Sequence, residues 1–230
     1  MEKVLIIGAS GHGKVVAEAI ELNEEYSIHG FIDSFKPVGE KVLDYEILGT
    51  EDLISQLYDQ GITRGVIAIG DNWTRFSLVE KIKRLVPDFE FITVIHPSAI
   101  ISKTVTIGKG SVILASATLN AEAKVGEFCI LNTGVNFGHE SKINDYSSLA
   151  PGVTVGGNVI IDTFSAICLG ANIIHSIHIG MHSIVGAGAL VNKDVENFRL
   201  AYGVPAKEIK EISVGEKYLS GKWKKQKVSL

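Results

Sequence analysis

Cysteine is scarce in this chain, and so are long apolar runs. Cys129 and Cys168 are the only two cysteines among 230 residues, too few for a disulfide framework or a Cys-rich zinc site, and they fit a reducing compartment. No segment approaches the roughly 20 apolar residues of a membrane span, and residues 1–7 lead directly into a strand-like run rather than a signal peptide. These absences predict a cytoplasmic protein without membrane insertion.

An excess of basic residues is also missing. Lys and Arg number 22 against 26 Asp and Glu, a net charge of −4. This balance provides no positive field to collect nucleic acid or anionic lipid, so we expect neither as a partner. The local basic run at residues 222–227 is interpreted as a solvated tail.

The first part of the chain, residues 1–94, alternates strand-like and helix-like segments. This order favours a Rossmann-like α/β domain with a parallel sheet and helical crossovers. Strands are expected at 4–7, 28–32, 65–69 and 89–93, and helices at 14–22, 51–59 and 75–85.

From Ile95 onward the apolar spacing changes to six. Every sixth residue from Ile95 to Val191 is apolar, and at 46% hydrophobic content such a run arises by chance about twice in a million. Four residues after these positions lies a mostly small set that includes Ser111, Ala117, Cys129 and Ser141. Six-residue units with small inward corners predict an all-β parallel β-helix over 95–196, with three units in each coil.

We expect the six-residue phase to be unbroken up to Val195, so that no loop interrupts the coils. Residues 197–230 would then form a C-terminal cap and tail. Recognition of a large acceptor must come from the first domain or from another subunit.

A glycine-rich loop follows the first strand and opens a helix, which directs backbone N–H groups at an anion. The motif lacks the full dinucleotide fingerprint, and a simple tight turn is the alternative interpretation. Asp33, at the end of the second strand, is where a ribose hydroxyl would be met, and Asn72 follows a later strand at the same edge. The predicted substrate-binding residues are Gly8, Ser10, Gly11, His12, Gly13, Asp33 and Asn72.

His139-Glu140 stands out within the repeats. One coil later lies Gly157, so a backbone N–H is expected about 4.8 Å from the imidazole. A histidine can act as a general base and a glycine amide can stabilise an oxyanion. Leu169 and Ala187, also one coil apart, form a second column suited to a long, thin cofactor. A metal site built from His175, His178 and His182 is disfavoured because their repeat positions face different directions.

The loop at 8–14, the six-residue array, His139-Glu140 and Gly203-Val-Pro-Ala-Lys207 together resemble the family of sialic acid O-acetyltransferases and sugar-nucleotide N-acetyltransferases, including the UDP-N-acetylbacillosamine type. The resemblance covers nearly the whole chain. It implies a left-handed β-helix, a homotrimer with active sites between neighbouring prisms, acetyl-CoA as cosubstrate without a metal, and a sugar nucleotide held by the first domain.

The resemblance also assigns residues. It makes His139 the general base with Glu140 beside it, and it places acetyl-CoA against Asn132, Gly157, Leu169 and Ala187. Ser148 stands where the bacillosamine type has a cofactor-contacting histidine.

The function expected from these patterns is acetyl-CoA-dependent N-acetylation of a UDP- or dTDP-linked 4-amino-dideoxysugar in surface-glycan synthesis. O-acetylation of sialic acid is the alternative within the same chemistry. A non-catalytic scaffold that assists a glycan synthase is the alternative from another class. A hydride-transferring oxidoreductase is disfavoured because the loop lacks the complete fingerprint.

Overall fold

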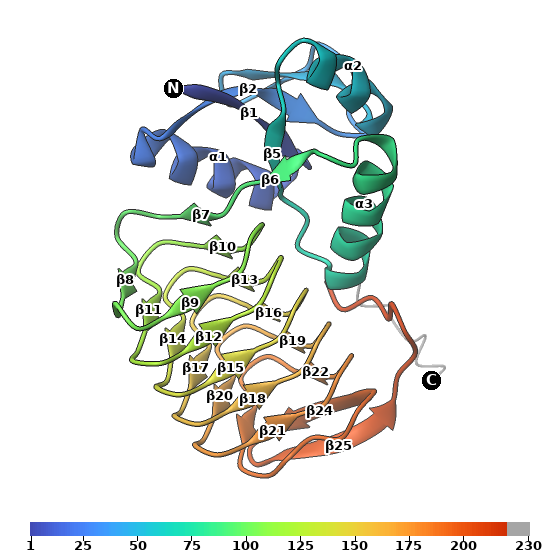
Figure 1. Ribbon diagram of the computed structural model, residues 1–230. Helices are drawn as coiled ribbons and strands as arrows, with labels where there is room; N and C mark the ends of the chain where they lie inside the picture. The colour runs from blue at the N-terminus through green and yellow to red at the C-terminus, as the bar shows by residue number, and fades with distance from the viewer. Residues whose placement is uncertain (220–230) are drawn as a thin grey trace, which may run out of the picture.

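The computed structural model describes residues 1–219 and comprises an α/β domain set on one end of a three-faced prism (Figure 1). The basic run at 222–227 lies outside these residues. None of the helices within residues 1–219 has the length and apolar content to cross a bilayer.

The first domain is a six-stranded sheet with the order β3-β4-β2-β1-β5-β6. Its strands are parallel except for the antiparallel β3–β4 pair, which the sequence patterns did not predict. Its elements are β1 (Glu2–Ile7), α1 (Gly11–Asn23), β2 (Tyr26–Ile32), β3 (Lys41–Val42), β4 (Tyr45–Gly49), a 3₁₀ turn (Glu51–Leu53), α2 (Ile54–Asp59), β5 (Arg64–Ile67), α3 (Asn72–Leu85) and β6 (Glu90–Phe91).

The remaining strands are mostly two residues long and stack in parallel on three faces. The first face holds β7 (Val94–Ile95), β10 (Val112–Ile113), β13 (Ile130–Leu131), β16 (Ser148–Leu149), β19 (Ala166–Ile167), β22 (Ile184–Val185), β24 (Arg199–Gly203) and β25 (Ala206–Glu211). The second holds β8 (Ile100–Ile101), β11 (Thr118–Leu119), β14 (Asn136–Phe137), β17 (Thr154–Val155), β20 (Asn172–Ile173) and β23 (Leu190–Val191). The third holds β9 (Thr106–Ile107), β12 (Lys124–Val125), β15 (Lys142–Ile143), β18 (Ile160–Ile161) and β21 (His178–Ile179).

The six-residue periodicity builds this left-handed β-helix directly. Ile130 pairs with Ser148, one coil of 18 residues later, and the same register holds on each face up to Val191. The apolar member of each strand points inward, and most of these side chains are fully buried. The small second set fills the corners, where Ser111, Cys129 and Ser141 have no exposed surface.

The expectation of an unbroken phase up to Val195 is wrong at the last coil. Ile184 pairs with Leu200, and Ile179 bridges Val195. Both partners follow after 16 residues instead of 18, because the chain cuts its final coil short and enters the β24–β25 hairpin.

The turns at the three corners share one conformation but carry different side chains. We name the corner between the first and second faces the glycine corner, after Gly134, Gly152, Gly170 and Gly188. The histidine corner, between the second and third faces, carries His139 and Gly157. The aromatic corner, between the third and first faces, carries Phe128, Tyr146, Phe164, His182 and Phe198. The glycines and the aromatic-corner residues all have positive φ.

The aromatic corner fixes the first domain on the prism. Its five rings stack in sequence with centroid separations of 5.0, 5.5, 4.6 and 5.2 Å. Trp73 and Phe76 of α3 pack edge-on against this stack, and α3 lies along the prism in Figure 1. This contact, together with α1 above β7, determines where the loops of the first domain lie relative to the coils.

Candidate active site

The imidazole of His139 is oriented by its neighbour in sequence. Glu140 has a positive φ of 57°, and its Oε2 lies 2.9 Å from Nδ1 of His139. A carboxylate at this distance favours the tautomer with the proton on Nδ1. Nε2 is then left with a free lone pair, which is the state that a general base requires.

Gly157 lies directly against this ring. A Cβ built on Gly157 would stand 2.4 Å from Nε2 of His139. No side chain fits there, so the backbone of residue 157 is exposed to whatever the imidazole contacts. The proximity expected from the spacing of 18 residues is confirmed.

A groove of about 760 Å³ runs down the outside of the first face. It begins at Gly70, at the carboxyl edge of the first domain, and continues to Leu200 near the end of the prism. Four of the five predicted cofactor residues line it: Asn132, Ser148, Leu169 and Ala187. Its surface is mostly apolar, which suits a pantetheine arm more than a sugar.

His139 and Gly157 are not part of this groove. They lie at the histidine corner, whereas Leu169 and Ala187 lie next to the glycine corner. One protomer therefore does not bring the predicted base and the predicted cofactor column together.

The glycine loop is shaped by close backbone contacts. Gly8 has a φ of 110°, and a Cβ there would lie 2.8 Å from the Ala68 carbonyl oxygen. A Cβ on Gly13 would lie 2.2 Å from the Gly8 oxygen. Gly11, in contrast, faces open space, and the side chain of Ser10 makes no capping bond to α1. Gly8 and Gly13 thus build the turn, while Ser10 and Gly11 remain accessible at the helix N-terminus.

Asp33 holds this loop from the neighbouring strand. Its Oδ2 accepts from Ala9 N at 2.8 Å, and its Oδ1 accepts from Phe35 N at 2.8 Å and Lys36 N at 3.1 Å. The carboxylate thereby fixes the rim of the candidate nucleotide site in addition to any contact with a ligand.

His12 has a buried Nε2 without a hydrogen-bond partner among residues 1–219. Burial, assisted by the nearby charge of Arg75, lowers the pKa of His12 to about 4. The ring is therefore neutral at physiological pH, and its free nitrogen lies in the loop that the sequence assigned to the acceptor.

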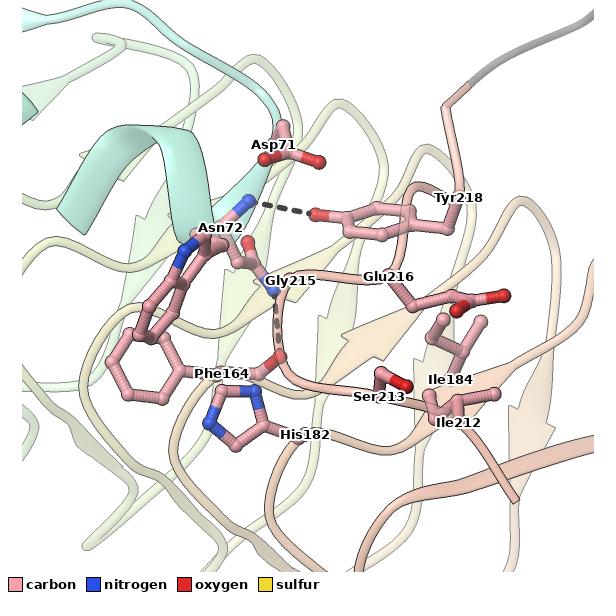
Figure 2. Close-up of a pocket in the computed structure, with 11 residues that line it drawn as sticks. Asp71, Asn72, Phe164, His182, Ile184, Ile212, Ser213, Gly215, Glu216 and Tyr218 are labelled. Carbon is pink, nitrogen blue, oxygen red and sulfur yellow. Dashed lines mark hydrogen bonds between the residues drawn. The ribbon is translucent and has the colours of Figure 1, made fainter. Parts of the chain in front are cut away.

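Asn72 is occupied by internal bonds, contrary to the role expected from its position. Its side chain donates to the carbonyls of Phe164 at 3.2 Å and Ser165 at 3.0 Å and accepts from Arg75 at 2.7 Å. Figure 2 shows its backbone N–H bonded to the hydroxyl of Tyr218. Asn72 is 2% exposed and holds the first domain on the prism, so we leave it out of the ligand site.

Arg75 is the main residue that sequence reasoning missed. Its guanidinium is fully buried and donates to Phe128 O, Ile69 O and Tyr146 O, among others. Burial lowers its pKa. The signal was present, because Arg75 lies on the helical stripe that continues through Val79 and Ile82.

The segment after β25 was also missed. It returns to the start of α3, where Tyr218 donates to Gly70 O at 3.1 Å and Lys217 pairs with Asp71 at 2.9 Å. Tyr218 also lies 3.4 Å from the Ser148 hydroxyl inside the groove. This C-terminal segment forms one wall of the groove, which no local motif indicates.

No group of three potential metal-binding side chains gathers within residues 1–219. His178 pairs with Asp162 at 2.8 Å. His182 lies in the aromatic stack, and burial lowers its pKa.

Comparisons with known proteins agree with this architecture. Residues 3–82 match the PglD N-terminal domain family. A curated UDP-N-acetylbacillosamine N-acetyltransferase from Bacillus subtilis (strain 168) is 36% identical over 118 residues, which is 50% of this chain and 52% of that protein. This chain therefore aligns with about half the length of that curated relative.

Two solved structures match nearly the whole chain. A histidine mutant of perosamine N-acetyltransferase from Caulobacter crescentus, in complex with CoA and GDP-perosamine, is 32% identical with a TM-score of 0.87, covering 92% of this chain and 98% of its own. The acetyltransferase domain of PglB from Neisseria gonorrhoeae FA1090, in complex with acetyl coenzyme A, is 29% identical with a TM-score of 0.82, covering 90% and 99%. The chain accordingly belongs to the hexapeptide-repeat family of sialic acid O-acetyltransferases and sugar-nucleotide N-acetyltransferases.

Proposed function

We propose that this protein transfers the acetyl group of acetyl-CoA to the amino group of a nucleotide-linked amino sugar, in the synthesis of a surface glycan. The observation that carries the proposal is the set formed by His139, Glu140 and Gly157. It joins an oriented base to a backbone amide, which are the two groups that acyl transfer to an amine requires.

The reaction follows from this geometry. Nε2 of His139 accepts a proton from the acceptor amine as its nitrogen attacks the thioester carbonyl. The Gly157 N–H donates to the oxyanion that forms. When the tetrahedral intermediate collapses, the carbon–sulfur bond breaks and the CoA sulfur takes the proton from His139, giving the amide and free CoA. Glu140 stabilises the imidazolium between these two steps.

The two substrates are assigned to different parts of the chain. Acetyl-CoA would lie in the groove along Asn132, Ser148, Leu169 and Ala187, with its thioester reaching Gly157. The sugar nucleotide would be held at the loop residues Gly8, Ser10, Gly11, His12 and Gly13, with Asp33 behind them. Gly70 lies at the upper end of the groove, so the loop edge and the cofactor path are continuous.

The separation of His139 from the groove within one protomer favours a homotrimer. In such an assembly the histidine corner of one prism would face the glycine corner of the next, which completes each site. We place the reaction in the cytoplasm, where both free thiols and acetyl-CoA are at home.

One assay tests the proposal. Purified protein is mixed with acetyl-CoA and with UDP-, dTDP- or GDP-linked amino sugars or sialic acid, and release of free CoA is followed. Rapid release with one amino sugar nucleotide is expected. Release with sialic acid alone would favour O-acetylation, and absence of release with every acceptor would contradict a transferase of this class.

A further inference from the structure

The N–H of Gly157 belongs to the peptide between Gly156 and Gly157, and this peptide is held from inside the prism. Oγ of Ser141 donates to the Gly156 carbonyl at 2.9 Å and accepts from Val159 N at 3.0 Å. Ser141 has no exposed surface. Its hydroxyl is therefore fixed on both sides, as donor and as acceptor.

The orientation of that carbonyl determines the orientation of the amide. In a trans peptide the C=O and the following N–H point in opposite directions. Because the Gly156 oxygen points inward to Ser141, the Gly157 N–H points outward, on the side where the His139 ring lies. No hydrogen-bond acceptor for this N–H is found within residues 1–219.

Gly138 restricts the same peptide from the preceding coil. A Cβ on Gly138 would lie 2.1 Å from the Gly156 oxygen and 2.6 Å from the Gly157 nitrogen. The peptide thus packs against a bare Cα on one side and is hydrogen-bonded by Ser141 from the interior, which leaves it little freedom to tilt.

We propose that Ser141 is a positioning residue of the transfer reaction. Its hydroxyl holds the Gly156–Gly157 peptide so that the Gly157 N–H is aimed at the developing oxyanion before the substrates arrive. Preorganised donors of this kind stabilise a transition state without a cost of reorientation. The inference rests on the proposed function, because it needs the acetyl transfer that Gly157 would assist.

A second inward serine provides a matched control. Ser111 donates to the Gly126 carbonyl at 2.8 Å and accepts from Cys129 N at 2.9 Å. The next amide, Glu127 N–H, is already bonded to Asp145 Oδ1 at 2.8 Å. The two serines make equivalent bonds, but only the peptide next to Ser141 presents a free N–H beside the base.

The test compares Ser141→Ala, Ser141→Cys and Ser111→Ala in the full-length protein. Alanine fits this inward position, since Ala123 and Ala171 occupy it in other coils without exposed surface. Cysteine fits too, because Cys129 occupies it and its Sγ lies 3.2 Å from the Asn144 carbonyl. All three variants are therefore expected to fold.

Ser141→Ala should lower kcat about tenfold, a fraction of the 10²- to 10³-fold loss on removing an oxyanion donor outright. KM for acetyl-CoA and for the acceptor should stay within about twofold, and the shape of the pH profile should not change, because the base is untouched. Ser141→Cys should fall between Ser141→Ala and wild type. Ser111→Ala should lose similar stability yet keep kcat within about twofold.

The outcomes separate the two proposals. A wild-type protein that releases CoA, with equal kcat in Ser141→Ala and Ser111→Ala, would overturn the positioning role and leave the function intact. A loss confined to KM would overturn it as well. A wild-type protein that releases no CoA with any acceptor would overturn the proposed function and this inference with it.

Discussion

The aromatic corner and the glycine corner are built on the same backbone but carry opposite side chains. At the aromatic corner Phe128 and Phe164 have φ values of 53° and 64°. At the glycine corner Gly134 and Gly170 have φ values of 69° and 61°. Left-handed residues other than glycine cost roughly 1–2 kcal/mol, and the aromatic residues offset this by stacking on one another and on α3.

The glycines are not explained by crowding within the protomer. A Cβ on Gly134, Gly152, Gly170 or Gly188 would have no heavy atom within 4 Å, and the aromatic corner shows that this φ tolerates large side chains. What covers each corner decides its residues. The chain covers its aromatic corner with its own helix, whereas the bare glycine corner leaves room for the acetyl-CoA and neighbouring protomer that we propose.

The largest expected effect is on the chemistry of the histidine corner. His139→Ala should lower kcat by about 10² to 10⁴, the usual contribution of a general base, because no other residue near Gly157 presents a free imidazole nitrogen. Steady-state kinetics on the proposed substrates measures it, with Glu140→Gln as a milder companion that removes only orientation and charge. A His139→Ala enzyme within about threefold of wild type would show that the corner carries no base.

Truncation at the aromatic corner should reduce stability instead of rate. Phe164→Ala removes the ring between Tyr146 and His182 and the contacts with Trp73 and Phe76. We expect a loss of about 2 to 3 kcal/mol in the free energy of unfolding, since the ring is partly exposed. Urea denaturation followed by tryptophan fluorescence measures it. A stable variant with lost activity would reverse the roles assigned to the two corners.

At the glycine corner the expected change is smaller. Gly170→Ala keeps a φ of 61° that disfavours alanine, but the added methyl group meets no atom of the protomer. The free energy of unfolding should fall by about 1 kcal/mol from backbone strain alone. Thermal unfolding checks this value. A loss of several kcal/mol would mean that the corner is crowded already in the single protomer.

The smallest effect concerns pH at the aromatic corner. Burial lowers the pKa of His182 in the folded state, so between this value and about 6.5 the unfolded chain binds more protons. The stability that a neutral His182 provides is present above about pH 6.5 and is lost as the pH falls below it. His182→Phe, which copies its stacked neighbours, should lose less stability than wild type between pH 7 and pH 5. Parallel slopes in urea titrations would remove the histidine as the cause.

The sequence predicted the repetitive parts of the molecule well and the long-range contacts poorly. The spacing of six fixes the coil, so the juxtaposition of His139 and Gly157 followed by addition alone. Asn72 was read as a ligand residue because it follows a strand at the right edge, but its partners Phe164 and Ser165 lie more than 90 residues away. Arg75 and Tyr218 were missed for the same reason, since neither belongs to a local pattern.

The shortened last coil also limits how prisms can associate. A β-helix ends in rims of unpaired backbone groups, and such rims can join end to end into fibres. Here β25, with its Ala-Lys-Glu-Ile-Lys-Glu sequence, covers the rim of the first face, and its glutamates pair with Arg199. The charged edge strand opposes further strand addition, so the chain gains a periodic structure of defined length without becoming a filament.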